Sequence, residues 1–218
     1  RPGRILQSAA DLNLRLVNCS TAAQYFHALR RQALLLETDP LPLFMLTPKG
    51  LLRRSAVAST PLELAEGHFQ PVIDDWRARS RPKEIHRLIL CSGKVFVDAD
   101  SSERRARASG VALCRVEQLY PFPAETLRGV VAGYPALRDV VWLQEEPENM
   151  GAWEFARPLL EDILNGRYPL RYVGRARSSS PSEGSAAWHH INQKALIEQA
   201  FDRTTPAAEP SLVLSKQV

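Results

Sequence analysis

Short apolar runs alternate with amphipathic segments over residues 86–201, and this alternation predicts the secondary structure of that half of the chain. The apolar runs predict strands at 86–91, 111–116, 140–143 and 170–173. Apolar residues at helical spacing predict helices at 94–108, 123–133, 153–164 and 186–201. Apolar strands that alternate with helices are typical of an α/β fold whose sheet is covered on both faces.

The first 50 residues contain a shorter version of the same pattern. It predicts the last turns of a helix at 4–10, strands at 14–17 and 43–46, and a helix at 23–33. Residues 53–84 lack a clear period and carry several prolines, so we interpret them as a connector between two domains. Residues 202–218 have no period either and predict a flexible tail.

Composition and charge narrow the function classes. Hydrophobic residues make up 44% and charged residues 24% of the 218 positions, as in a soluble globular protein. No basic run is interleaved with aromatics, which argues against nucleic-acid binding, and no apolar stretch reaches the roughly 18 residues of a membrane span. Cys19, Cys91 and Cys114 are too widely spaced for a zinc site or a disulfide framework, so we expect reduced thiols, with Cys91 and Cys114 in the core.

Polar groups follow three of the predicted strands, where ligands of open α/β sheets bind. They are Ser92-Gly93-Lys94, Glu117-Gln118 and Gln144-Glu145-Glu146. The first group combines a glycine, a helix start and a lysine, which suits an anion. The upstream glycine of a phosphate loop is absent, so a capped helix start is the favoured alternative.

The adjacent carboxylates Glu145 and Glu146 suggest an acid/base pair, a metal site or an ion-paired contact. Neighbours in a strand face opposite sides, so the two cannot easily share one substrate, and no third metal ligand lies nearby in sequence. We therefore favour an arginine-paired contact at a domain or subunit interface. His27, beside Phe26, is interpreted as a packed histidine, and no common catalytic motif is present.

Six longer motifs occur in an order that resembles a known enzyme family. They are AQYFHALRRQA (23–33), FMLTPKGLLR (44–53), LCSGKVF (90–96), CRVEQLYPFP (114–123), VWLQEEPENMGAW (141–153) and LRYVGR (170–175). They resemble the C-terminal third of the thiamine-diphosphate-dependent decarboxylase component of 2-oxoglutarate dehydrogenase. The 2-oxoadipate-specific relative shares most of them and stays an alternative.

The resemblance implies a division of the chain. Residues 1–75 would be the end of a pyrimidine-binding, transketolase-like domain, followed by a linker at 76–84. Residues 85–201 would be a transketolase-type C-terminal domain with a mixed sheet flanked by helices, and 202–218 a tail. The family is an oxidoreductase of the tricarboxylic acid cycle, a homodimer that decarboxylates 2-oxoglutarate and passes the succinyl group to a lipoyl-bearing succinyltransferase core. It is cytoplasmic in bacteria and lies in the mitochondrial matrix in eukaryotes.

The resemblance also implies where the cofactor belongs. The family's thiamine diphosphate and Mg²⁺ ligands lie upstream of the part that this chain matches, and the chain opens without a Met, so we expect an inactive fragment of a longer enzyme.

Some bacterial members bind acetyl-CoA in this region. This implies a candidate acyl-CoA effector site at Arg53, Ser92, Lys94, Gln144 and Arg175, with Glu145 and Glu146 at an interface. A non-catalytic module that binds an acyl-CoA or a nucleotide is the alternative from a different function class.

Overall fold

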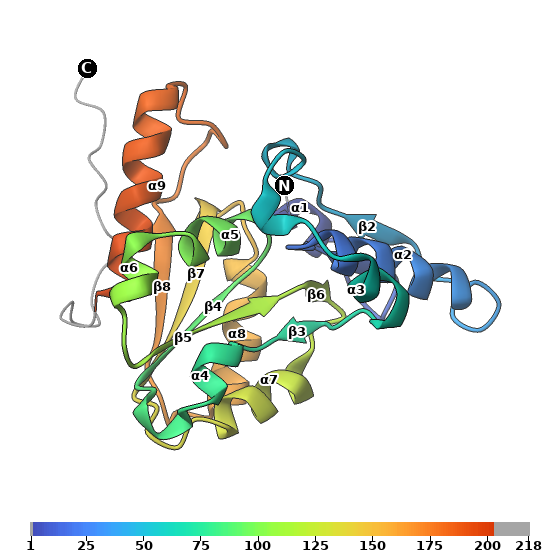
Figure 1. Ribbon diagram of the computed structural model, residues 1–218. Coiled ribbons are helices and arrows are strands. Elements are labelled where there is room, and N and C mark those ends of the chain that lie inside the picture. Colours follow the sequence, from blue (N-terminus) through green and yellow to red (C-terminus); the bar gives the residue numbers. More distant parts are fainter. Residues whose placement is uncertain (1, 203–218) are drawn as a thin grey trace.

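A five-stranded sheet dominates the computed structural model, which describes residues 2–202 (Figure 1). Its strand order is β3-β5-β4-β7-β8. The strands are β3 (Val72–Ile73), β4 (Arg87–Cys91), β5 (Val111–Val116), β7 (Asp139–Pro147) and β8 (Leu170–Arg175). β3 runs antiparallel to β5, and the other neighbours are parallel. The predicted mixed α/β sheet is therefore confirmed.

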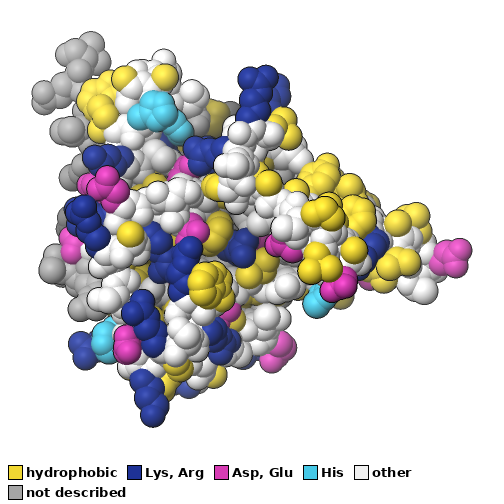
Figure 2. Space-filling model, viewed as in Figure 1, with side chains coloured by type: hydrophobic (Ala, Val, Ile, Leu, Met, Phe, Trp, Pro, Cys, Tyr) yellow, Lys and Arg dark blue, Asp and Glu magenta, His cyan; other side chains and the backbone are white. Residues whose placement is uncertain are grey.

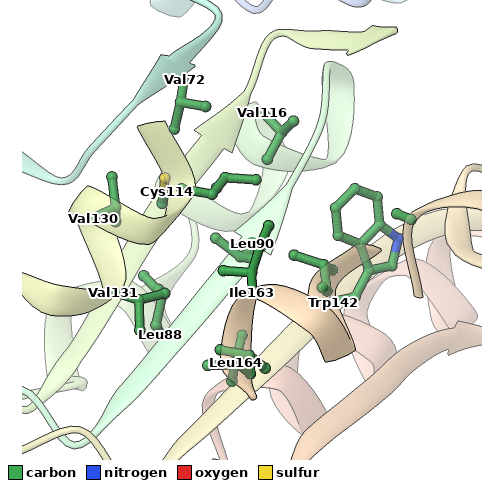
Figure 3. Packing of buried hydrophobic residues seen from close by; sticks show 14 of the residues in the cluster. Val72, Leu88, Leu90, Cys114, Val116, Val130, Val131, Trp142, Ile163 and Leu164 are labelled. Carbon is green, nitrogen blue, oxygen red and sulfur yellow. The ribbon is translucent and has the colours of Figure 1, made fainter. Parts of the chain in front are cut away.

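Alternating side chains of the central strands build a separate core on each face of this sheet. Leu88 and Leu90 of β4 pack with Trp142 of β7 on one face. That face is covered by α7 (Ala124–Ala132) and α8 (Trp153–Leu164), as Figure 3 shows with Val131, Ile163 and Leu164. Ile89 and Cys91 face the other way, toward α5 (Lys94–Asp100) and α9 (Ala186–Phe201). Both faces are thus buried, which explains why β4 is apolar from Leu88 to Cys91.

A second sheet has the order β2-β1-β6 and joins the two halves of the chain. β1 (Arg15–Val17) pairs in parallel with β2 (Leu43–Met45) and antiparallel with β6 (Gln118–Tyr120). The helix α2 (Ala22–Leu34) connects β1 to β2 and is capped by Thr21, whose side chain accepts a hydrogen bond from the Gln24 N–H. The short β6 was not predicted, and it follows β5 after the single residue Glu117.

Residues 53–84, which show no clear period in the sequence, contain several short elements, and their role as a connector between domains stays a prediction. This segment and its flank hold η1 (Lys49–Leu51), η2 (Ser55–Val57), α3 (Pro61–Glu66), β3, α4 (Trp76–Arg79) and η3 (Pro82–Glu84). β3 is an edge strand of the large sheet, and Phe69 and Val72 are buried. These elements are too short to show the period that sequence reasoning depends on. The domain boundaries stay predictions.

Two other expectations change in detail. The single helix predicted at 94–108 is two, α5 and α6 (Glu103–Arg107), because Ser102 caps α6 by accepting from the Arg105 N–H. The predicted helix at 4–10 is the shorter α1 (Pro2–Leu6). The predicted tail beyond 202 lies outside the described residues. Within residues 2–202, no helix is both long and apolar enough to cross a membrane.

Candidate functional site at the carboxyl edge of the sheet

Lys94 lies at the centre of a polar network at the carboxyl ends of β4 and β7. Its Nζ is 2.6 Å from Asp98 Oδ2, one turn along α5, and 3.0 Å from Glu145 Oε2. Gln193 of α9 donates to the same two carboxylates, over 2.9 Å to Asp98 and 3.2 Å to Glu145. The network therefore ties α5 and α9 to the end of β7.

Arg175, at the end of β8, continues the network. Its guanidinium donates to the Gln193 side-chain oxygen over 3.1 Å and to the backbone carbonyl of Glu145. The same group pairs with Glu183, whose Oε1 lies 3.1 Å from Arg175 Nε. On the other side, Arg54 pairs with Asp98. Arg54, α5, β7, β8 and α9 thus meet at this edge.

Opposite charges balance within the network. The three cations Arg54, Lys94 and Arg175 meet the three carboxylates of Asp98, Glu145 and Glu183. Burial lowers the pKa of Lys94, but the carboxylates of Glu145 and Asp98 outweigh it and hold that pKa above its usual value. Burial alone would raise the pKa of Asp98, yet Lys94 lowers it on balance. The charged forms are therefore the stable ones in the folded chain.

The structure brings together only part of the predicted acyl-CoA site. Lys94 and Arg175 share the network, whereas Arg53 is exposed and its neighbour Arg54 contacts Asp98 instead. Ser92 lies between β4 and α5, where its hydroxyl oxygen is buried and makes no hydrogen bond within the described residues.

Gln144 belongs to the opposite face of the sheet. Its side-chain oxygen accepts from Trp142 Nε1 and from the Trp153 N–H, each over 3.1 Å, and its amide donates to the Pro147 carbonyl. It is 4% exposed and satisfies the first N–H of α8, whose cap residue Ala152 has no side-chain acceptor. Gln144 therefore positions a helix and does not face Lys94.

Glu145 and Glu146 have different surroundings. Glu145 pairs with Lys94 inside the chain, so its partner is a lysine where an arginine was expected. Burial raises the pKa of Glu146, and repulsion from Glu145 raises it further. The interface role of the two carboxylates stays a prediction.

Glu117 follows β5 and closes the seam between the two sheets. It is fully buried and accepts hydrogen bonds from the Ser20 N–H, over 2.8 Å, and from the Ser20 hydroxyl. Arg115 donates to the same hydroxyl over 3.0 Å. Burial raises the pKa of Glu117, and the hydrogen bonds from Ser20 oppose that rise. The prediction placed Glu117 at a strand end, but it did not foresee the contact with Ser20, which lies 97 positions earlier.

Two hollows in the described residues lie at the other end of the sheet. Each measures about 560 Å³ and lies beside α6, and both are lined by Arg107, Ala108, Ser109 and Val111, the last being the first residue of β5. Residues 2–202 contain no group of three or more His, Cys, Asp or Glu side chains that could hold a metal ion. The edge around Lys94, in contrast, is a closely paired network of charged and polar side chains.

Comparison with known proteins places this geometry in context. A family profile described as 2-oxoglutarate dehydrogenase C-terminal matches residues 58–201. The 2-oxoglutarate dehydrogenase E1 component of Shouchella clausii is 42% identical over 206 residues, which are 93% of this chain and 22% of that protein. The E1 component of Bacillus mycoides is 40% identical over 207 residues, with the same coverage. The chain spans about a fifth of the length of these curated relatives.

A solved structure with a related fold is a split-gene transketolase in an inactive beta4 tetramer. It aligns with a TM-score of 0.54 and 14% identity, over 87% of this chain and 58% of that one. At this identity the likeness concerns the fold, and it supports the transketolase-like architecture.

Proposed function

Because the chain belongs to the family described as 2-oxoglutarate dehydrogenase C-terminal, we propose that it is the C-terminal part of a 2-oxoglutarate dehydrogenase E1 component. The observation that carries this proposal is the match over 58–201, which includes all five strands of the large sheet. In this proposal the complete enzyme decarboxylates 2-oxoglutarate and passes the succinyl group to the lipoyl group of a succinyltransferase.

The chain's own role in that enzyme is structural. Thiamine diphosphate would supply the decarboxylation chemistry, and its ligands and those of Mg²⁺ would come from the length of the relatives that this chain does not span. Among residues 2–202 there is no group of three or more His, Cys, Asp or Glu side chains that could hold the metal ion. The buried network around Lys94 and the seam at Glu117 instead hold the two sheets and α9 in register. We propose that the complete enzyme is a homodimer.

A segment exchange tests the proposal. The matching C-terminal part of the Shouchella clausii E1 component would be replaced by this chain, and 2-oxoglutarate-dependent reduction of an artificial acceptor would be measured with thiamine diphosphate and Mg²⁺. We expect activity within about tenfold of the parent, because the exchanged parts are 42% identical. The same exchange with the Bacillus mycoides segment, which is 40% identical to this chain, is the control. It shows whether the Shouchella clausii enzyme tolerates the junction.

A folded hybrid that is inactive, beside an active control hybrid, would overturn the proposed function. A hybrid that prefers 2-oxoadipate to 2-oxoglutarate would assign the chain to the 2-oxoadipate-specific relative instead.

We also propose, as a narrower second function, that this edge binds an acyl-CoA effector. The supporting observation is that Arg54, Lys94 and Arg175 converge on one network beside the exposed Arg53. A phosphate could meet Lys94 only by displacing Asp98 or Glu145, so the binding must offset the loss of those pairs. Calorimetry of the hybrid enzyme with acetyl-CoA should show micromolar binding that Lys94→Ala weakens at least tenfold. No heat at high micromolar acetyl-CoA, or unchanged affinity in Lys94→Ala, would overturn this second proposal.

A further inference from the structure

One of the two hollows beside α6 extends to α4 and is lined by several arginines. It measures about 560 Å³, a size typical of small-molecule sites, and we call it the α4–α6 hollow. All of its lining residues lie between positions 77 and 111, and four of them are Arg77, Arg81, Arg105 and Arg107. Asp100 is the one acidic residue among them. Figure 2 shows Lys and Arg side chains over the part of the surface that carries α4 and α6 in Figure 1.

Two of these arginines are held by carboxylates of their own chain. The side chain of Arg105 is 8% exposed, donates to the Val111 carbonyl over 3.0 Å and pairs with Asp75. Arg77 Nη1 lies 2.6 Å from Oδ1 of Asp100, the acidic lining residue. These two pairs therefore add no excess charge to the hollow.

The other two arginines have only long and exposed partners. Arg81 Nη1 lies 3.7 Å from Glu84 Oε2, and Arg107 Nη2 lies 3.5 Å from Glu103 Oε2. More than 45% of each of these four side chains is exposed, and neither glutamate lines the hollow. Such pairs contribute little to stability and are screened by salt. An anion can therefore bind both guanidinium groups without breaking a buried contact, which it cannot do at Lys94.

We propose that the α4–α6 hollow binds a small phosphate monoester, whose phosphate group pairs with Arg81 and Arg107. At pH 7 such a group carries a charge of about −1.5 to −2, which matches two cations. A guanidinium group donates two parallel hydrogen bonds to phosphate oxygens, so arginine suits this ligand better than lysine does. A phosphate alone leaves most of the hollow empty. The exposed lining residues Ser101 and Ala106 offer a hydroxyl and an apolar surface to the organic part of the ligand.

This site is separate from the edge around Lys94. Val111 lines the hollow and is the first residue of β5, whereas Lys94 and Glu145 lie where β4 and β7 end. The inference therefore rests neither on the acyl-CoA proposal nor on the proposed enzyme function.

Calorimetric titration of this chain tests the inference, with glucose 6-phosphate as the probe. We expect a Kd below about 1 mM for glucose 6-phosphate and no heat with glucose, because the phosphate group carries the charge. Inorganic phosphate should bind about tenfold more weakly, since it lacks an organic part that contacts the rest of the lining. Equal affinities for glucose 6-phosphate and inorganic phosphate would contradict the assignment of a monoester.

Substitutions of the two arginines test which groups bind the phosphate. Arg81→Gln and Arg107→Gln should each weaken the binding of glucose 6-phosphate about tenfold, because each removes a charge-assisted pair. Arg128→Gln is the matched control with the same change of charge. Arg128 on α7 is 42% exposed, pairs with Glu125 and Asp162 and lies outside the hollow, so its substitution should leave the affinity unchanged. Circular dichroism establishes that each variant is folded.

No heat with about 10 mM glucose 6-phosphate would overturn the inference, and so would an affinity that Arg81→Gln and Arg107→Gln both leave unchanged. If the isolated chain does not fold, the segment-exchange hybrid is titrated with the same ligands and the same variants. The acceptor-reduction activity of that hybrid tests the enzyme assignment separately, so the failure of one proposal is distinguishable from the failure of the other.

Discussion

At the scale of single residues, Lys94 is paired with two carboxylates of its own chain, Asp98 and Glu145. Its side chain is 18% exposed and that of Glu145 is 23% exposed, so the pair lies between a surface and a buried ion pair. Exposed pairs contribute about 0–1 kcal/mol, whereas removing one partner of a buried pair costs about 3–5 kcal/mol.

We therefore predict that Lys94→Met lowers the free energy of unfolding by about 2 kcal/mol at pH 7. The reason is that Asp98 and Glu145 would lose their cation while staying partly buried. Urea denaturation measures the change, and Lys194→Met, at an exposed position of α9, is the control. Equal stability of the two variants would show that the network contributes nothing.

For Glu146 we predict that a substitution raises the stability of the folded chain. Burial raises the pKa of Glu146 above its usual value of 4.5, so the folded chain binds this proton more tightly than the unfolded chain does. As the pH rises above 4.5, ionisation of Glu146 therefore lowers the free energy of unfolding. Glu146→Gln removes this decrease, because glutamine does not ionise. We expect a higher Tm for Glu146→Gln at pH 7 and no difference below pH 4.5. A lower Tm at pH 7 would contradict this assignment.

At the scale of elements, the carboxylate of Asp75 links the short segments before β4 to the large sheet. Asp75 caps α4 by accepting from the Arg77 N–H, over 3.0 Å. Its other oxygen accepts from the Leu113 N–H of β5, over 2.9 Å, and pairs with Arg105. One buried side chain thus joins a helix start, an edge of the sheet and α6.

We predict that Asp75→Ala destabilises the chain by about 2–4 kcal/mol, which combines a lost cap with an unsatisfied buried donor. Thr60→Ala is the matched control, since Thr60 caps α3 at an exposed site and should cost only about 1 kcal/mol. Thermal unfolding compares the two. Hydrogen exchange at the Leu113 amide should speed up in Asp75→Ala alone, and unchanged protection there would contradict the model of a shared carboxylate.

At the scale of the whole molecule, the role that we propose for the chain is that of a scaffold within a longer enzyme. We predict that the isolated chain shows no 2-oxoglutarate-dependent reduction of an artificial acceptor with added thiamine diphosphate and Mg²⁺. The physical reason is that residues 2–202 hold no cluster of ligands for the metal. An intact E1 component assayed in parallel is the control, and comparable turnover by the isolated chain would refute the prediction.

The sequence by itself determined the alternation of strands and helices and both faces of the large sheet. The run from Leu88 to Cys91 is apolar at every position, and such a run is stable as a strand only when both of its faces are buried. It also determined the place of Lys94 and Glu145 at the carboxyl edge, because parallel strands end on the same side of their sheet. The motifs supplied the family resemblance, which the matches to relatives confirm.

Only the tertiary structure decided which side chains meet. Gln193 reaches Glu145 from 48 positions away, and Glu117 reaches Ser20 from 97 positions away, so no local pattern could reveal either contact. Gln144 and Glu145 are neighbours in sequence, yet alternation in β7 sends one to α8 and the other to α5. Period and spacing describe a chain one segment at a time, whereas hydrogen bonds and ion pairs form between whatever segments the fold brings within about 3 Å.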